Sequence, residues 1–137
     1  METVHVRLGL SGTYWGNQPQ YRVLANDRVV KEGSAGDLEY IEFDFEYDKT
    51  ATLAVELLNK TNRDTVIDSQ NNIIKDQLLN IDSLEIDEID LAQIAYQHSS
   101  YTTYDNRIVA NCVNLGWNGR WELTWTDPFY LWLLENM

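Results

Sequence analysis

Alternation of apolar and polar residues is the feature of this sequence that most limits its fold. It is clearest in residues 4–10 (VHVRLGL), 38–48 (LEYIEFDFEYD) and 120–126 (RWELTWT). Successive side chains of a β-strand point to opposite faces of a sheet, so each segment predicts a strand with one buried and one solvated face. A chain that carries several such strands must fold as sheets that pack on each other.

Turn signals divide much of the remaining chain into further strands. Residues 21–33 predict a hairpin with its turn at Asn26 and Asp27, and residues 50–60 and 107–119 read as strands. Polar loops are expected at residues 11–20, 61–76 and 98–106. The total is about eight or nine strands, a pattern typical of an antiparallel β-sandwich of jelly-roll type.

Residues 78–96 (LLNIDSLEIDEIDLAQIAY) change the phase of this alternation. The apolar residues fall first on odd, then on even, then again on odd positions. One flat strand cannot keep them all on one face, so the segment predicts a strand with two bulges or a corner between sheets. A helix competes over part of the segment, but the β-branched residues and the alternating acids favour a strand.

The segment TDPFYLWLLENM, residues 126–137, is the only one that looks helical. Thr126 or Asp127 can cap a helix of about residues 127–136, and Pro128 suits its first position. The helix has almost no polar face, so it must be covered on more than one side. We expect an inner side packed on Trp117, Trp121 and Trp125. A partner chain would cover the other side, and we expect Phe129, Trp132 and Leu133 to bind it.

The fold predicted for residues 1–137 is therefore a single all-β domain, an antiparallel jelly-roll β-sandwich with a short C-terminal helix. The net charge of −12 opposes contact with nucleic acid phosphates and anionic membranes. No apolar stretch is long enough to span a membrane, and no signal peptide is visible, so we expect synthesis in the cytoplasm. The single cysteine, Cys112, allows no internal disulfide.

The motifs of common enzymes are missing, which predicts a protein that is not an enzyme. The glycines are scattered rather than grouped in a phosphate loop, and His5 and His98 lack the spacing of a zinc site. No serine or cysteine is paired with a base in a recognisable motif. The sequence therefore predicts a protein that acts by binding.

Two sets of residues are candidates for binding. Asp64, Asp68 and Asp76 lie in and beside the long polar stretch, where they can supply oxygens to a weak Ca²⁺ site or simply be solvated. Loop aromatic residues can stack on sugars or fill a partner's pocket, or else cap the edge of the sandwich. These are Tyr14, Trp15, Tyr101 and Tyr104.

Two resemblances add to this interpretation. The stretches NRDTVID and KDQLLNIDSLEID, within residues 53–91, resemble the strand, acidic loop and strand of calcium-dependent xylan-binding modules. Those modules are small jelly-roll sandwiches in which loop aspartates hold calcium that touches sugar hydroxyls. The resemblance matches Asp64 and Asp76 to those acids, and Asp68 more loosely. The whole chain, including GWNGRWELTWTDPFYLWLLENM, resembles small structural proteins of tailed bacteriophages that share this sandwich.

The leading hypothesis is a non-catalytic virion component of a bacteriophage, such as a tail, fibre-attachment or decoration protein. It would be made in the host cytoplasm, bind other virion subunits or itself as a homo-oligomer, and present its loops to a host-surface glycan. The alternative is a calcium-dependent carbohydrate-binding module.

Overall fold

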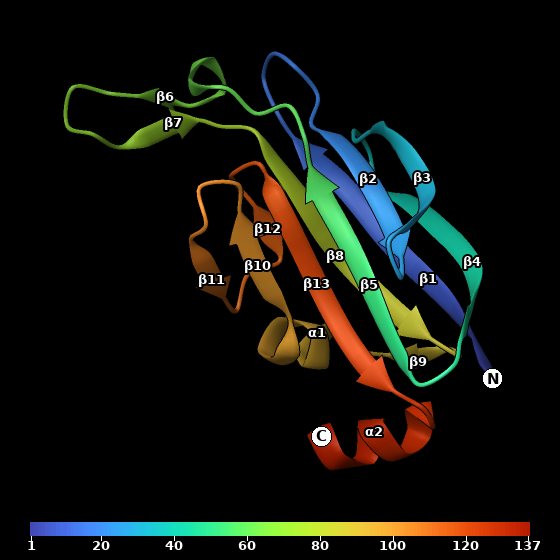
Figure 1. The fold of residues 1–137 in the computed structure, drawn as a ribbon. Coiled ribbons are helices and arrows are strands. Elements are labelled where there is room, and N and C mark those ends of the chain that lie inside the picture. Colours follow the sequence, from blue (N-terminus) through green and yellow to red (C-terminus); the bar gives the residue numbers. More distant parts are fainter.

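The alternating segments form two facing antiparallel sheets in the computed structural model, which describes residues 1–137 (Figure 1). The smaller sheet has the order β12–β8–β1–β4, with β9 paired to β8, and the larger has the order β11–β10–β13–β5–β2–β3. The predicted all-β sandwich with a short C-terminal helix is confirmed. The strands of the smaller sheet are β1 (Glu2–Thr13), β4 (Glu39–Tyr47), β8 (Leu78–Ile86), β9 (Ile89–Asp90) and β12 (Asn114–Leu115). Those of the larger sheet are β2 (Gln20–Ala25), β3 (Arg28–Ser34), β5 (Thr50–Leu57), β10 (Ser100–Thr103), β11 (Ile108–Ala110) and β13 (Gly119–Thr126).

The core lies between the two sheets and is built by the alternation seen in the sequence. Trp121, Leu123 and Trp125 of β13 are fully buried, whereas the residues between them face outward. Residues 40–47 of β4 alternate in the same way, with the odd positions turned inward. One cluster of 28 buried residues joins both sheets.

The first change of phase in residues 78–96 is a bulge in β8, one bulge rather than the two bulges or the corner that the sequence predicted. The pairing of β8 with β1 skips Asp82, because Gly9 pairs with Ser83 and Leu10 with Ile81. The extra residue lets Ile81 and Leu84 face the same core.

Residues 92–96 were predicted wrongly as strand. After β9 the chain forms helix α1 (Ala92–His98), whose Ala95 is buried. A tight turn at Asp87 and Glu88, both with positive φ, ends β8 and reverses the chain. Packing of α1 on β8 outweighs the local strand preference.

Residues 61–76 are not an open loop. They contain a short 3-10 helix, Asn62–Asp64, and a hairpin of β6 (Val66–Ile67) and β7 (Ile73–Lys75) that projects from the body (Figure 1). With these short elements the chain has thirteen strands, more than the eight or nine predicted.

The C-terminal helix α2 (Phe129–Asn136) packs its inner side on the lower end of the sandwich (Figure 1). Phe129 is fully buried against Trp125, with ring centroids 6.1 Å apart, and Leu133 is also buried. Neither can bind a partner chain, so two of the three predicted contact residues are corrected, and Trp132 is only partly buried. The exposed side of α2 instead carries apolar residues at Tyr130, Leu131 and Leu134.

The cap of α2 also differs from the prediction. Pro128 is the N-cap residue and supplies no side-chain hydrogen bond. The amide of Phe129 donates instead to Glu2 Oε1 of β1, at 2.9 Å. A carboxylate from the other end of the chain therefore satisfies the first free amide of the helix.

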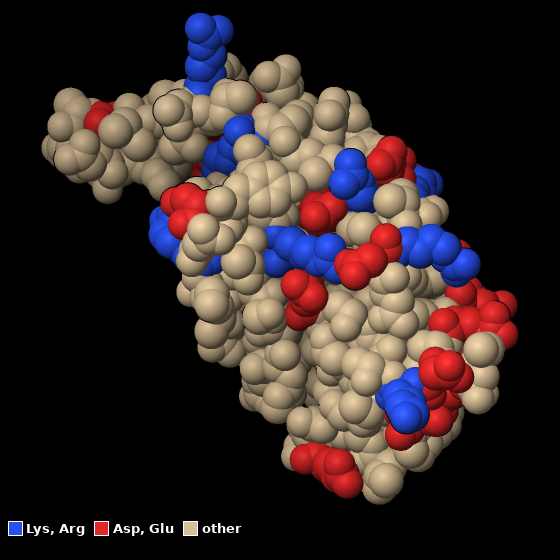
Figure 2. Space-filling model, viewed as in Figure 1, with Lys and Arg blue, Asp and Glu red and all other residues tan.

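Neither α1 nor α2 is long and apolar enough to cross a membrane. Figure 2 shows basic and acidic side chains next to each other across the outer face of the larger sheet. The ion pairs there include Arg22 with Glu32, at 2.9 Å, and Arg120 with Asp27, at 2.5 Å. The negative net charge is thus locally balanced on this face.

Candidate functional site

Strand register brings three loops together at the end of the sandwich opposite α2. The chain leaves β5 at Leu57, enters β13 at Gly119 and leaves β10 at Thr103, and Gly119 pairs with both of the others. A Cβ at Gly119 would lie 2.5 Å from the carbonyl oxygen of Thr102, so the close approach of β10 and β13 requires glycine here. The loops beyond these three residues must therefore be neighbours.

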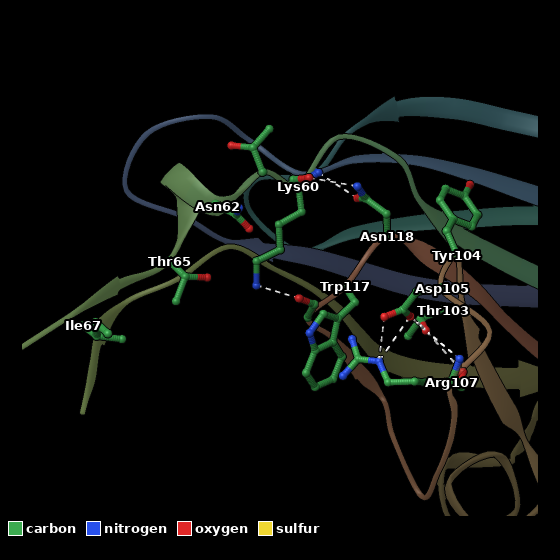
Figure 3. A pocket seen from close by; sticks show the side chains of 12 residues that line it. Lys60, Asn62, Thr65, Ile67, Thr103, Tyr104, Asp105, Arg107, Trp117 and Asn118 are labelled. Carbon is green, nitrogen blue, oxygen red and sulfur yellow. Dashed lines mark hydrogen bonds and ion pairs between the residues drawn. The ribbon is translucent and has the colours of Figure 1, made fainter. Parts of the chain in front are cut away.

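The three loops enclose an open groove of about 510 Å³, which we call the hairpin groove (Figure 3). One wall is the base of the β6–β7 hairpin, with Ile67 and Thr65, and the other is the β10–β11 turn. Residues 116–118, between β12 and β13, form its floor with Lys60. Its lining is mainly polar, and Ile67, Tyr104 and Trp117 are its large apolar and aromatic members.

Trp117 is the largest side chain in the hairpin groove, and it is 46% exposed. Its main chain is held from below by Tyr101, whose hydroxyl accepts from the Trp117 amide at 3.0 Å and donates to the Trp117 carbonyl. The Arg107 guanidinium lies over one face of the indole ring, 4.8 Å from the ring centroid. Arg107 is itself fixed by Asp105, at 3.1 Å. The ring is therefore a positioned surface rather than a free loop side chain.

Asp105 is an ionised partner in this arrangement. Hydrogen bonds from the Thr103 hydroxyl and from Arg107 hold the pKa of its carboxyl below the ordinary value. At neutral pH the groove thus presents a paired carboxylate and guanidinium next to an indole ring.

Asn118 joins all three loops. Its side chain accepts from the Lys60 amide at 2.7 Å and donates to the Lys60 carbonyl at 2.9 Å. Its own carbonyl accepts from the amide of Tyr104 at 3.0 Å. Through its side-chain amide and its main-chain carbonyl, Asn118 thus fixes the spacing between the hairpin base, the β10–β11 turn and the floor.

The Lys60 ammonium lies under the groove between two oxygens. It is 2.6 Å from Asp76 Oδ1 and 2.6 Å from the carbonyl oxygen of Gly116. Burial alone would raise the pKa of Asp76, but hydrogen bonds from Lys60, Thr65 and the Gln77 amide outweigh it and lower that pKa.

The predicted metal residues are not brought together. Asp64 is buried and accepts from the amide and hydroxyl of Thr61, which caps the 3-10 helix. Asp68 accepts from the amides of Gln70 and Asn72 in the hairpin turn, which lower its pKa. Asp76 pairs with Lys60. No group of three or more histidine, cysteine, aspartate or glutamate side chains is placed to hold a metal ion, so these residues do not fit calcium.

The predicted aromatic residues divide into three groups. Tyr101 is fully buried in the core, so its expected contact with a sugar is wrong, and its segment is a strand rather than a loop. Tyr104 is exposed and lines the hairpin groove. Tyr14 and Trp15 are exposed outside it, where the Trp15 indole donates to the Asp64 carbonyl at 3.0 Å.

Trp117, Arg107, Asn118 and Lys60 were not predicted as site residues. Trp117 was expected in the core under α2, yet it is exposed in the hairpin groove just before β13, whereas α2 follows the opposite end of that strand. Its sequence context, GWNG, was the available signal, because glycine and Asn-Gly mark a turn on either side of the indole.

A scan against models of protein families found no match, and a search of curated proteins found no similar sequence. Among solved structures, the chain is similar to "vCBM60 in complex with galactobiose", with a TM-score of 0.54 and 13% identity over 86% of this chain and 95% of that chain. It is also similar to a selenomethionine form of vCBM60, with a TM-score of 0.56 and 12% identity over 87% of this chain and 88% of that chain. The description of that second structure states that circular permutation provides an evolutionary link between two families of calcium-dependent carbohydrate binding modules.

At such low identity the similarity shows the fold alone. Neither structure is described as a virion protein, so the expected bacteriophage role gains no support from it.

Proposed function

We propose that this chain is a non-catalytic carbohydrate-binding domain that holds a glycan in the hairpin groove. The observation that carries the proposal is Trp117, a half-exposed indole whose main chain is fixed by Tyr101 and whose ring is flanked by polar groups. A flat apolar ring with hydrogen-bonding groups close to it suits a sugar, which has apolar C–H faces and a rim of hydroxyls. The fold supports this, since one similar structure is described in complex with galactobiose.

The charges in the groove favour a neutral glycan. Its two cations, Lys60 and Arg107, are each paired with a carboxylate, at 2.6 Å and 3.1 Å. An anionic sugar would find no free positive charge, and a cationic one no free carboxylate. Hydroxyl groups can instead bond to the outer oxygens and N–H groups of these pairs.

The test compares two exposed aromatic residues at opposite ends of the molecule. The full chain is screened on a glycan array that includes galactobiose, and the affinity of the best ligand is measured by calorimetry. Truncation of a central aromatic anchor costs about 2 kcal/mol or more, so we expect Trp117→Ala to weaken binding at least about 30-fold. Tyr130→Ala, on the exposed side of α2, is the control and should leave affinity within about twofold.

Three results would count against the proposal. Absence of binding to every glycan would reject the function. Equal binding by wild type and Trp117→Ala would place the ligand elsewhere. Loss of binding in Trp15→Ala with no effect of Trp117→Ala would favour the earlier prediction of a site at Tyr14 and Trp15.

An assembly contact through α2 is a second candidate, favoured by the exposed apolar residues Tyr130, Leu131 and Leu134. The virion role is a specific form of this candidate. An oligomer in light scattering that dissociates in Leu134→Asp would support it, whereas a monomeric wild type would count against it.

A further inference from the structure

The carboxylates near the hairpin groove are all engaged within the chain. Asp76 and Asp105 are each paired with a cation, and Asp64 and Asp68 cap local backbone amides. A calcium ion takes about six to eight oxygens, several of them from free carboxylates. A divalent ion that entered this groove would meet two side-chain cations first.

The Lys60 ammonium joins two segments that lie far apart in the sequence. Asp76 follows the β6–β7 hairpin, and Gly116 precedes Trp117 in the floor. Both oxygens are 2.6 Å from Nζ, and the Lys60 side chain is only 11% exposed. The Lys60 main chain is clamped at both its N–H and C=O by Asn118, which fixes the point from which the side chain reaches these two oxygens.

We propose that the Lys60 ammonium holds the hairpin base to the loop of Trp117, a task that a bound divalent cation could otherwise perform, and that folding and ligand binding here are independent of calcium. The chain would then differ from the calcium-dependent modules with which one similar structure is described. The part of this inference that concerns ligand binding rests on the proposed function. The part that concerns folding does not.

The first test is thermal unfolding of the full chain in about 5 mM calcium chloride and in EDTA. A ligand that binds only the folded state raises Tm. The calcium concentration used here is above the largest dissociation constants, about 1 mM, that are usual for calcium-binding modules. We expect the two Tm values to agree within about 2 °C. A larger rise in calcium would overturn the proposal, whether or not any glycan is known.

The second test compares the loss of Lys60 alone with the loss of both charges of the Lys60–Asp76 ion pair. Lys60→Met keeps the length of the side chain but leaves Asp76 without its cation, which is more harmful than removing both charges. We therefore expect Lys60→Met to lower Tm by several degrees and Lys60→Met/Asp76→Asn to recover part of that loss. Asp68→Asn, on a carboxylate that contacts only its own turn, is the control. A Lys60→Met variant as stable as the wild type would overturn the proposal.

The third test uses the glycan identified on the array. We expect its affinity to agree within about twofold between calcium and EDTA, and a loss of tenfold or more in EDTA would overturn the ligand-binding part. If no glycan binds at all, the proposed function fails while the unfolding tests still decide whether Lys60 replaces a metal ion.

Discussion

Tyr101→Phe removes one hydroxyl and tests the link between the core and the hairpin groove. That hydroxyl accepts from the Trp117 amide at 3.0 Å and donates to the Trp117 carbonyl. Leaving such groups unpaired costs about 1–3 kcal/mol. With an unfolding entropy of about 2.1 cal/mol/K per residue over 137 residues, this lowers Tm by about 3–10 °C.

Tyr47→Phe is a matched control at the other end of the sandwich. The Tyr47 hydroxyl is buried, accepts from the Trp125 indole at 3.1 Å and donates to Glu2. Its loss should lower Tm by a similar amount without touching the groove. Only Tyr101→Phe is expected to weaken glycan binding, by about 3- to 10-fold, because only this variant releases the Trp117 amide and carbonyl from the hydroxyl that holds them.

The assays are thermal unfolding, calorimetric affinity and amide hydrogen exchange. We expect the Trp117 amide to exchange faster in Tyr101→Phe and to keep its wild-type rate in Tyr47→Phe, a readout that needs no ligand. Unchanged exchange at Trp117 would show that the hydroxyl does not hold this loop. Equal loss of affinity in both variants would mean that lower stability, rather than the position of Trp117, weakens binding.

Two further predictions concern stability. Phe129→Ala, at the buried end of α2, should cost about 3–5 kcal/mol in chemical denaturation, whereas Leu134→Ala, on the exposed side, should stay within about 0.5 kcal/mol, and equal effects would contradict the packing of the helix. Burial raises the pKa of Tyr101 to about 12, and burial with a carboxylate partner raises those of Tyr21 and Tyr47 further. The folded state therefore resists tyrosine ionisation, so its stability should be intact below about pH 10 and fall as the pH rises through about 12. Absorbance titration at alkaline pH with all eight tyrosines ionising near pH 10 in the folded protein would contradict this.

Local patterns predicted the strands well where packing follows the alternation. β4 and β13 have the buried and exposed faces that their sequences indicate, and the phase change in β8 marks a real bulge. The pattern failed where tertiary contacts decide. Residues 92–96 end a segment whose β-branched residues and alternating acids suggested a strand throughout, but α1 packs on β8 as a helix.

The groove was harder to predict because its residues take their roles from distant partners. The segment of Tyr101 has the composition of a contact loop, yet pairing with Trp121 on β13 turns the tyrosine into the core. The residue that the sequence predicted as a ligand contact therefore supports the proposed one, Trp117, from below. The role of Asp76 was equally hard to predict, because nothing near it in the sequence shows that Lys60 will pair with its carboxylate.

The topology explains why the groove forms at this end. In antiparallel sheets every second loop returns to the same end, so the chain after β5, after β10 and before β13 must emerge side by side. The register places Leu57, Gly119 and Thr103 in one row, and each leads directly into a lining loop. The opposite end is closed by α2, which buries Phe129 there. A groove built from residues 60–67, 103–107 and 116–118 is thus a consequence of strand order, and Asn118 and Lys60 are the two residues that fix its width.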